Sequence, residues 1–235
     1  PVQIRFSSSW GVVEMPDHLA VTIPLKDIQR IQLYINTARR SLSQIQRETG
    51  ADYILNGTLY NMSTFVPNCH LKADGKVLCK PDYTVSGYSW NDGPDISMDM
   101  LPDASQRNYI TCTPLIVSGK PLSKLIYDEG QGGKRGRSAI GVKDGSLALY
   151  CTRDGGSMTR TPEALRDDLT AAGWDSAVML DSGGSSQCYF NGAVIQSSRN
   201  VHDLILVYLK KGETTVGKKK VVLDPGHDAG HLATK

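Results

Sequence analysis

Short apolar runs separated by turn-forming dipeptides recur through most of this chain, and this pattern restricts the fold to one rich in β-strands. Asp-Gly and Asn-Gly accept the positive φ angles of tight hairpin turns, so they predict antiparallel neighbours on either side. The first 36 residues alternate polar and apolar positions in the same way and predict further strands with tight turns. The clearest turn dipeptides are Ser118-Gly119, Asp144-Gly145 and Asn191-Gly192.

Two segments show a helical period instead. Residues 38–49 place apolar side chains on one helical face, and Gly50 follows as a stop signal. Residues 161–173 begin with Thr161, a good N-cap, and Pro162, which suits the first helical position. The chain is therefore expected to be a β-rich α+β domain, with mixed sheets and two or three helices.

Composition excludes some classes of function. Of the 235 residues, 40% are hydrophobic and 21% are charged, which is enough apolar material for a sizeable core. The net charge is only +2, and basic residues cluster only in 134–137 and 218–220, which argues against a nucleic-acid partner. No run approaches the ~18 apolar residues of a membrane span. The first ten residues contain no apolar core of a signal peptide.

The composition changes near the end of the chain and predicts a domain boundary. Residues 1–209 are expected to form one domain. Residues 210–220 are polar, charged and contain glycine, as is typical of a linker. Residues 221–235 return to an apolar strand followed by Asp-Pro-Gly-His, and we expect them to open a second domain that is cut short.

The stretch AVMLDSGGSS places an acid and several turn residues directly after an apolar strand. Asp181 ends the strand, and Gly183 and Gly184 allow the chain to turn and a ligand to approach closely. Successive amide N–H groups in such a turn form a concavity that suits phosphate oxygens, and Ser185 and Ser186 add donors. The alternative is an ordinary tight turn in which Asp181 only caps backbone amides.

Several stretches, in this order, resemble the elements of the phosphodiester glycosidase family. The resemblance covers roughly residues 38–209. Thr58 and Ser182 stand where the family has glycine. The stretches are Asn56-Gly57 in ILNGTLYN, Arg137-Ser138-Ala139-Ile140-Gly141, Arg153-Asp154-Gly155, Leu180 to Ser186, and Arg199-Asn200-Val201.

The resemblance implies hydrolysis of a glycosidic bond in a sugar-1-phosphodiester. Asp181 would act as general acid/base or as nucleophile. Asn56 and Arg137 would complete the catalytic set, with Asp154 as the second acid that a two-carboxylate glycosidase uses. No cofactor is implied, although the motif is also compatible with a divalent ion. The implied substrate-binding residues are Gly57, Gly183, Gly184, Ser185, Ser186 and Arg199.

Each of these side chains also has a purely structural interpretation. Asn56 is a residue type that tolerates a left-handed turn. Arg137 lies in a basic stretch, GGKRGRS, that suits a solvated loop. Arg199 could pair with a surface acid, and Asp154 precedes two glycines and could form a turn.

The last fifteen residues resemble a second family. VVLDPGHDAG is similar to the opening of zinc-dependent N-acetylmuramoyl-L-alanine amidases, in which the histidine is a zinc ligand; here it is His227. A catalytic zinc needs about three protein ligands, and the others would lie beyond Lys235. Zinc is therefore expected only for the complete amidase domain.

The two resemblances together indicate one module of a cell-wall hydrolase, such as an endolysin. The expected partner is a cell-wall glycopolymer or peptidoglycan, for example a teichoic acid. The expected location is the bacterial cell wall, reached as an extracellular or phage-encoded protein. A competing hypothesis is a non-catalytic wall-binding module that directs the amidase to its substrate, and Thr58 and Ser182 favour it. A structural spacer is a third possibility.

Overall fold

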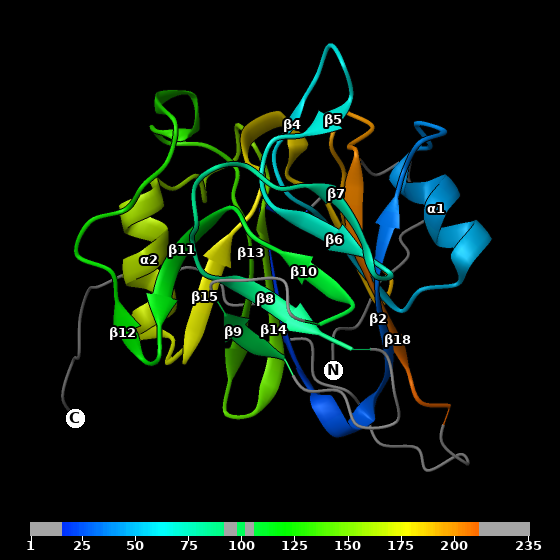
Figure 1. Ribbon diagram of the computed structural model, residues 1–235, viewed down its shortest axis with the longest axis horizontal. Helices are drawn as coiled ribbons and strands as arrows, with labels where there is room; N and C mark the ends of the chain where they lie inside the picture. The colour runs from blue at the N-terminus through cyan, green and yellow to red at the C-terminus, as the bar shows by residue number, and fades with distance from the viewer. Residues whose placement is uncertain (1–15, 92–97, 102–105, 212–235) are drawn as a thin grey trace, which may run out of the picture.

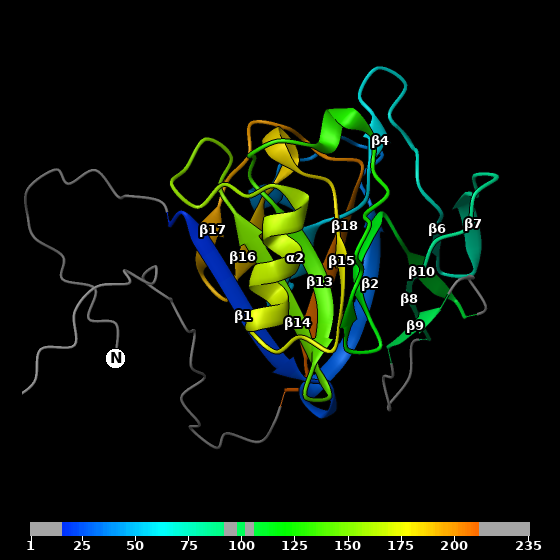
Figure 2. The ribbon, with the colours of Figure 1, turned by 90° about the vertical axis from the view of Figure 1, so that its left-hand side faces the viewer.

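The computed structural model describes residues 16–91, 98–101 and 106–211. The strands predicted in the first fifteen residues, most of the predicted linker and the whole 221–235 segment with His227 lie outside the described residues. In the described part, two antiparallel sheets face each other, each with one helix on its outer side, and a third sheet closes one flank (Figures 1 and 2).

The first sheet contains the predicted hairpin at Asp144-Gly145. Both turn residues have positive φ, 47° and 67°, as the dipeptide predicted. Ser118 and Gly119 likewise turn the chain with φ of 49° and 74°. In spatial order the strands are β1 (His18–Pro24), β14 (Ser146–Thr152), β13 (Ser138–Lys143), β15 (Ser176–Met179), β11 (Thr113–Val117) and β12 (Lys120–Pro121).

The second sheet faces the first and contains the predicted hairpin at Asn191-Gly192, with φ of 47° and 101°. Its central strand, β3 (Tyr53–Asn56), is buried along its whole length. In spatial order the strands are β17 (Ala193–Ile195), β16 (Cys188–Phe190), β3, β18 (Asp203–Leu209) and β2 (Ile28–Ile35).

A third, shorter sheet and a two-stranded ribbon complete the β-structure of the described residues. The ribbon projects beyond the body at the end where the loops after β15 lie (Figures 1 and 2). The third sheet contains β7 (Lys76–Cys79), β6 (Leu71–Ala73), β10 (Asn108–Ile110), β8 (Gly87–Trp90) and β9 (Asp99–Leu101), and the ribbon contains β4 (Tyr60–Asn61) and β5 (Val66–Pro67).

Helix α1 (Leu42–Thr49) covers the outer face of the second sheet. It begins with a capping box between Ser41 and Gln44 and ends at Gly50, whose φ of 65° confirms the predicted stop. The predicted start at residue 38 is too early. The Asn36 side chain holds both the amide N–H and the carbonyl of Arg40, so the preceding residues form a turn.

Helix α2 (Pro162–Ala171) covers the outer face of the first sheet. The Thr161 hydroxyl accepts a hydrogen bond from the Ala164 amide at 3.1 Å, as its N-cap position predicted. Leu165 and Leu169 are buried against the sheet. Short 3-10 turns lie at Leu25–Asp27, Glu129–Gln131 and Gly183–Ser185.

The prediction of mixed sheets is wrong for the described residues, because all of their strand pairs are antiparallel. Helix α2 connects β14 to β15, which run in the same direction. Strand β13 lies between them and runs opposite to both, so the crossover creates no parallel pair.

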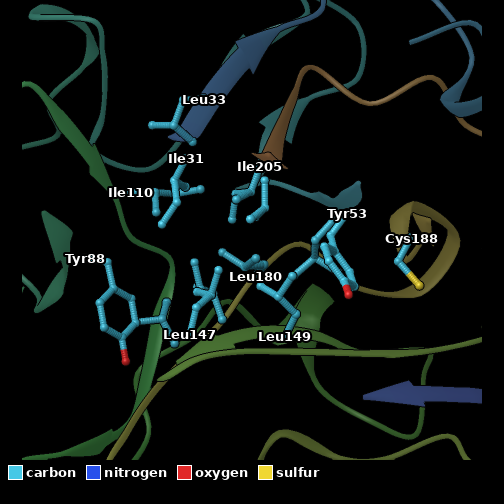
Figure 3. Packing of buried hydrophobic residues seen from close by; sticks show 14 of the residues in the cluster. Ile31, Leu33, Tyr53, Tyr88, Ile110, Leu147, Leu149, Leu180, Cys188 and Ile205 are labelled. Carbon is cyan, nitrogen blue, oxygen red and sulfur yellow. The ribbon is translucent and has the colours of Figure 1, made fainter. Parts of the chain in front are cut away.

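The largest apolar cluster fills the space between the sheets. Figure 3 shows Leu147 and Leu149 from β14 facing Ile31 from β2 and Ile205 from β18. Leu180 follows β15 and points into the same core. This packing anchors the strand ends from which the candidate site is built. No helix among the described residues is long and apolar enough to cross a membrane.

Candidate active site

Asn56 joins strand ends from the two facing sheets. Its amide Nδ2 donates to the carbonyl of Asp181 at 2.9 Å, and its Oδ1 accepts from the Ser138 hydroxyl at 2.5 Å and from the Gln187 amide at 3.2 Å. The residue is extended in β3, so the left-handed turn alternative is wrong. Asn56 has no exposed surface and holds other residues in place. Its predicted contact with substrate stays a prediction.

Gly57 lies between two acidic residues. Its carbonyl accepts from the Asp181 amide at 3.1 Å, and its own amide donates to the Asp203 carbonyl at 2.8 Å. A Cβ at this position would overlap the Asp203 carboxylate, so only glycine fits. We refer to the set Asn56, Gly57, Asp181 and Asp203 as the junction.

Asp181 is the reactive candidate within the junction. Its side chain is buried, with 8% of the residue's surface exposed, and its Oδ1 accepts from the Ser182 amide at 2.8 Å. Burial raises its pKa to about 6, because desolvation of the charged form outweighs the hydrogen bonds from Ser185 and Ser182. The Asp203 charge raises the pKa further, and Arg199 opposes this.

Asp203 is a second buried carboxyl beside Asp181, and the sequence interpretation missed it. Its Oδ1 accepts from the Thr58 amide at 2.8 Å, and its Oδ2 lies 3.0 Å from Nδ1 of His202. Burial raises the pKa of Asp203, and the His202 and Thr58 contacts oppose that rise. Asn56 and Asp181 are also polar residues next to apolar strand residues. Asp203 is the first residue of the apolar strand β18, and that shared signal could have identified it.

Two aromatic residues of the β4–β5 ribbon, Tyr60 and Phe65, pack against His202 beside the junction. The Tyr60 ring stacks on His202 with centroids 6.3 Å apart, and Phe65 meets the same imidazole edge-on at 5.3 Å. The Arg39 guanidinium lies over Phe65, 4.0 Å from its centroid. Burial raises the pKa of Tyr60, the nearby Asp181 charge adds to the rise, and a hydrogen bond with Ser185 opposes it. Tyr60 therefore stands within reach of the reacting end of the site.

The SGGSS turn after β15 is tightly folded. Gly183 adopts φ of 64°, and the amides of Gly183, Ser185 and Ser186 each donate to a backbone carbonyl. No described residue accepts a hydrogen bond from the Gly184 amide. The Ser186 hydroxyl is buried without a partner among the described residues. The predicted anion-holding row of amides is therefore reduced to one N–H group.

Arg199 is exposed to solvent next to the glycine turn. Its guanidinium packs over Gly184, where an added Cβ would come within 3.0 Å of Cζ. Its Nη1 donates to the Ser185 hydroxyl at 3.4 Å. The structural alternative, pairing with a surface acid, is wrong: no described carboxylate lies within 4.0 Å of this guanidinium. Its predicted role in substrate binding stays a prediction.

Arg137 is fully buried, and its alternative as a solvated loop residue is wrong. Its Nε donates to the carbonyl of Arg160 at 2.7 Å, and its two terminal nitrogens donate to those of Gln131 at 2.8 Å and Gly133 at 2.6 Å. Desolvation lowers its pKa to about 10, and the charge of Arg135 contributes. The guanidinium thus holds the 131–133 loop, and its predicted phosphate contact stays a prediction.

Asp154 is exposed at the opposite side of the glycine turn from Arg199. Its Oδ1 accepts from the Gly136 amide at 2.8 Å, and its Oδ2 lies 3.8 Å from the place of an added Cβ on Gly183. Arg135, which sequence reasoning did not select, borders the same glycine, with Nη1 3.7 Å from that Cβ position. The role of Asp154 as second acid stays a prediction. We refer to Arg135, Asp154 and Arg199 as the rim.

The described residues do not bring three His, Cys, Asp or Glu side chains together as a metal site. His227, predicted as a zinc ligand, lies outside them. What the arrangement offers chemically is a buried carboxyl that gains and loses a proton near pH 6, close to an exposed guanidinium. The carboxyl can exchange a proton with a ligand, while the guanidinium holds an anionic group of that ligand.

In a comparison with protein-family models, the phosphodiester glycosidase model matches residues 31–208 of this chain. This span includes the whole junction and the whole rim. No curated protein sequence matches the chain.

Solved structures of low sequence identity share the fold. A hypothetical protein from Synechocystis superposes with a TM-score of 0.64 at 13% identity over 82% of this chain, and the match covers 59% of that protein. The catalytic domain of zebrafish N-acetylglucosamine-1-phosphodiester alpha-N-acetylglucosaminidase, auto-inhibited by its pro-peptide, gives a TM-score of 0.61 at 12% identity. That match covers 84% of this chain and 85% of the zebrafish domain.

Proposed function

Since this chain belongs to the phosphodiester glycosidase family, we propose that it hydrolyses the glycosidic bond of a sugar-1-phosphodiester. The observation that carries the proposal is the Asp181 carboxyl, buried at the converging strand ends with its pKa raised to about 6. A carboxyl poised near the working pH is suited to proton transfer in the transition state. The zebrafish structure of the same fold is named for this class of reaction.

In the proposed step, ionised Asp181 accepts a proton from a water molecule while the water oxygen bonds to the anomeric carbon. The bond between that carbon and the phosphate oxygen breaks, and the phosphate leaves as a monoester anion with the bonding electron pair. Because the leaving group is already anionic, it needs no proton from a second acid. Asp203 is a positioning residue: its carbonyl binds the Gly57 amide and its carboxylate binds the Thr58 amide, which holds both residues next to Asp181.

The two departures from the family's glycine pattern are compatible with this activity. Ser182 has φ of −130°, an extended conformation open to any residue, and its hydroxyl donates to the Leu180 carbonyl at 3.1 Å. The Thr58 hydroxyl donates to the Thr111 carbonyl at 2.6 Å. Both side chains are thus accommodated by hydrogen bonds to backbone carbonyls, so the fold tolerates each departure from glycine.

We further propose that the substrate is a cell-wall glycopolymer, such as a teichoic acid, and that the protein acts at the bacterial cell wall. The resemblance of residues 221–235 to the opening of cell-wall amidases supports this choice. We propose that the phosphodiester glycosidase domain needs no cofactor and that a complete amidase domain would use zinc.

The test is release of free sugar from purified wall teichoic acid and from a panel of sugar-1-phosphodiesters. We expect release by wild type, loss with Asp181→Asn, and retention with the control Asp167→Asn, an exposed acid on α2. Wild type that releases no sugar from any substrate, yet still sediments with purified walls, would replace the enzyme with a wall-binding module.

A further inference from the structure

Two arginines flank the glycine turn from opposite sides. Arg135 borders Gly183, with its Nη1 3.7 Å from the position of an added Cβ, and Arg199 borders Gly184, with Nη2 3.2 Å from the equivalent position. Neighbouring Cα atoms lie about 3.8 Å apart, so the two guanidinium groups border adjacent residues of one turn. Their origins are far apart in sequence, and only the fold brings them together.

Neither guanidinium is neutralised within the described part of the chain. Arg135 donates to the Gly132 carbonyl and Arg199 to the Ser185 hydroxyl, but neither has a carboxylate within 4.0 Å. Three other arginines in this half of the protein behave differently: Arg153, Arg160 and Arg166 each pair with an aspartate. Two exposed cations that border one short turn and have no ion-pair partner within 4.0 Å can attract an anionic ligand.

The turn between the arginines is shaped to admit such an anion. Glycine at 183 and 184 leaves no Cβ between the turn and the two guanidinium groups, although the Asp154 carboxylate also borders this space, with Oδ2 3.8 Å from the position of an added Cβ on Gly183. The Gly184 amide donates to no described group, and the buried Ser186 hydroxyl has no described partner. Planar guanidinium groups bind phosphate through paired N–H donors, so the chemistry of the turn matches a phosphate group.

We propose that Arg135 and Arg199 form a clamp that binds the phosphate of the substrate over Gly183 and Gly184. The inference rests on the proposed function, and it identifies the residues through which the enzyme selects a substrate that carries a phosphate group. The Ser185 hydroxyl accepts from Arg199 at 3.4 Å and lies close enough to Asp181 to lower its pKa, so phosphate held by Arg199 lies near the reacting carboxyl. Arg135 holds the phosphate from the far side, beyond Gly183.

Arg135 can be replaced without disturbing the fold. Its side chain is exposed, and its backbone bridges Arg160 through N–H and C=O groups that any residue retains. Lys134 is exposed next to it and serves as a control of matched charge. Lys134→Gln removes the same charge from the same loop without touching the glycine turn.

Binding of inorganic phosphate, measured by calorimetry, tests the clamp without turnover. We expect Arg135→Gln and Arg199→Gln each to weaken binding by about tenfold to a hundredfold, because each removes charge-assisted hydrogen bonds. Arg135→Lys keeps the charge but loses the paired N–H donors of the guanidinium. Its affinity for phosphate should lie between those of wild type and Arg135→Gln. Lys134→Gln should bind as wild type does. Arg135→Gln that binds phosphate as tightly as wild type would overturn the proposal.

Turnover separates the clamp from the proposed function. On a sugar-1-phosphodiester, Arg135→Gln should raise KM by about tenfold or more. On a nitrophenyl glycoside of the same sugar, which has no phosphate, kcat/KM should match wild type. An equal fall on both substrates would contradict the clamp. Phosphate binding that depends on both arginines, in a protein that cleaves neither substrate, would support the clamp and remove the proposed function.

Discussion

The junction and the rim lie side by side, but their polar groups are occupied in opposite ways. In the junction, side chains and backbone hold one another through hydrogen bonds shielded from solvent. At the rim, the two guanidinium groups are exposed, and no described carboxylate, Asp154 included, lies within 4.0 Å of either. Burial here fixes one carboxyl and raises its pKa, whereas exposure leaves cations available for a ligand.

Arg137 and Arg135 show the same contrast only two residues apart. The buried arginine donates to three backbone carbonyls and has no exposed surface. The exposed one makes a single described side-chain hydrogen bond, to the Gly132 carbonyl. The residue type alone therefore does not reveal which arginine meets a ligand.

Replacing Gly57 should have the largest effect, because it breaks the junction itself. In Gly57→Ala the new methyl group would overlap the Asp203 carboxylate and displace it from the Thr58 amide. We expect a loss of about 4 kcal/mol or more in the free energy of unfolding. Urea denaturation measures this loss. Gly130→Ala, where an added Cβ meets nothing within 4 Å, is the control and should be close to wild type.

Replacing the buried Arg137 should cause the second-largest loss of stability, whereas replacing Arg135 at the rim should cause almost none. Arg137→Gln leaves backbone carbonyls of the 131–133 loop without donors, so stability should fall by about 3 kcal/mol. Arg135→Gln should leave stability unchanged within about 0.5 kcal/mol. Parallel thermal and urea melts of the two variants decide the matter, and equal losses would show that the two positions do not differ as described.

The smallest expected effect is a gain in stability. The pKa of Asp181 is raised from 3.8 to about 6, so the folded state binds its proton more tightly than the unfolded chain does. Stability should therefore fall as pH rises from about 4 to 6 and stay low above that. The total cost of ionised Asp181 is at most about 3 kcal/mol. Titratable or charged groups near the carboxyl are Asp203, Arg199 and Tyr60, of which Tyr60 stays neutral over this pH range because its pKa is raised.

Asp181→Asn removes that ionisation while keeping an acceptor for the Ser182 amide. We expect the variant to be about 1–2 kcal/mol more stable than wild type at pH 8 and to lose this advantage near pH 4. Urea midpoints at the two pH values measure it. A variant that is less stable than wild type at pH 8 would mean that ionised Asp181 is favourable in its site.

Much of the fold could be predicted from local chemistry. Asp144-Gly145 and Asn191-Gly192 form the hairpins that their positive φ angles allow, and Thr161 and Gly50 bound the helices as expected. The strand that ends in an acid followed by two glycines and two serines indicated Asp181 and the glycine turn, and the family resemblance supported that choice. These features depend on neighbouring residues, which a sequence displays directly.

The rest of the site depends on contacts between distant segments. The pairing of β18 with β3 places Asp203 beside Gly57, 146 positions away in sequence. The GGKRGRS stretch contains Arg135 and Arg137, and only the fold decides which one turns inward. The absence of parallel pairs likewise follows from the position of β13 between β14 and β15.

The most direct test of the account is the pH dependence of kcat/KM on the sugar-1-phosphodiester that releases most sugar. If ionised Asp181 is the base, kcat/KM should be flat above about pH 7 and fall tenfold per pH unit well below about pH 6, following the raised pKa of this carboxyl. Asp181→Asn should show no turnover at any pH. A rate that stays constant down to about pH 4.5, or turnover that persists in Asp181→Asn, would contradict the central role of Asp181.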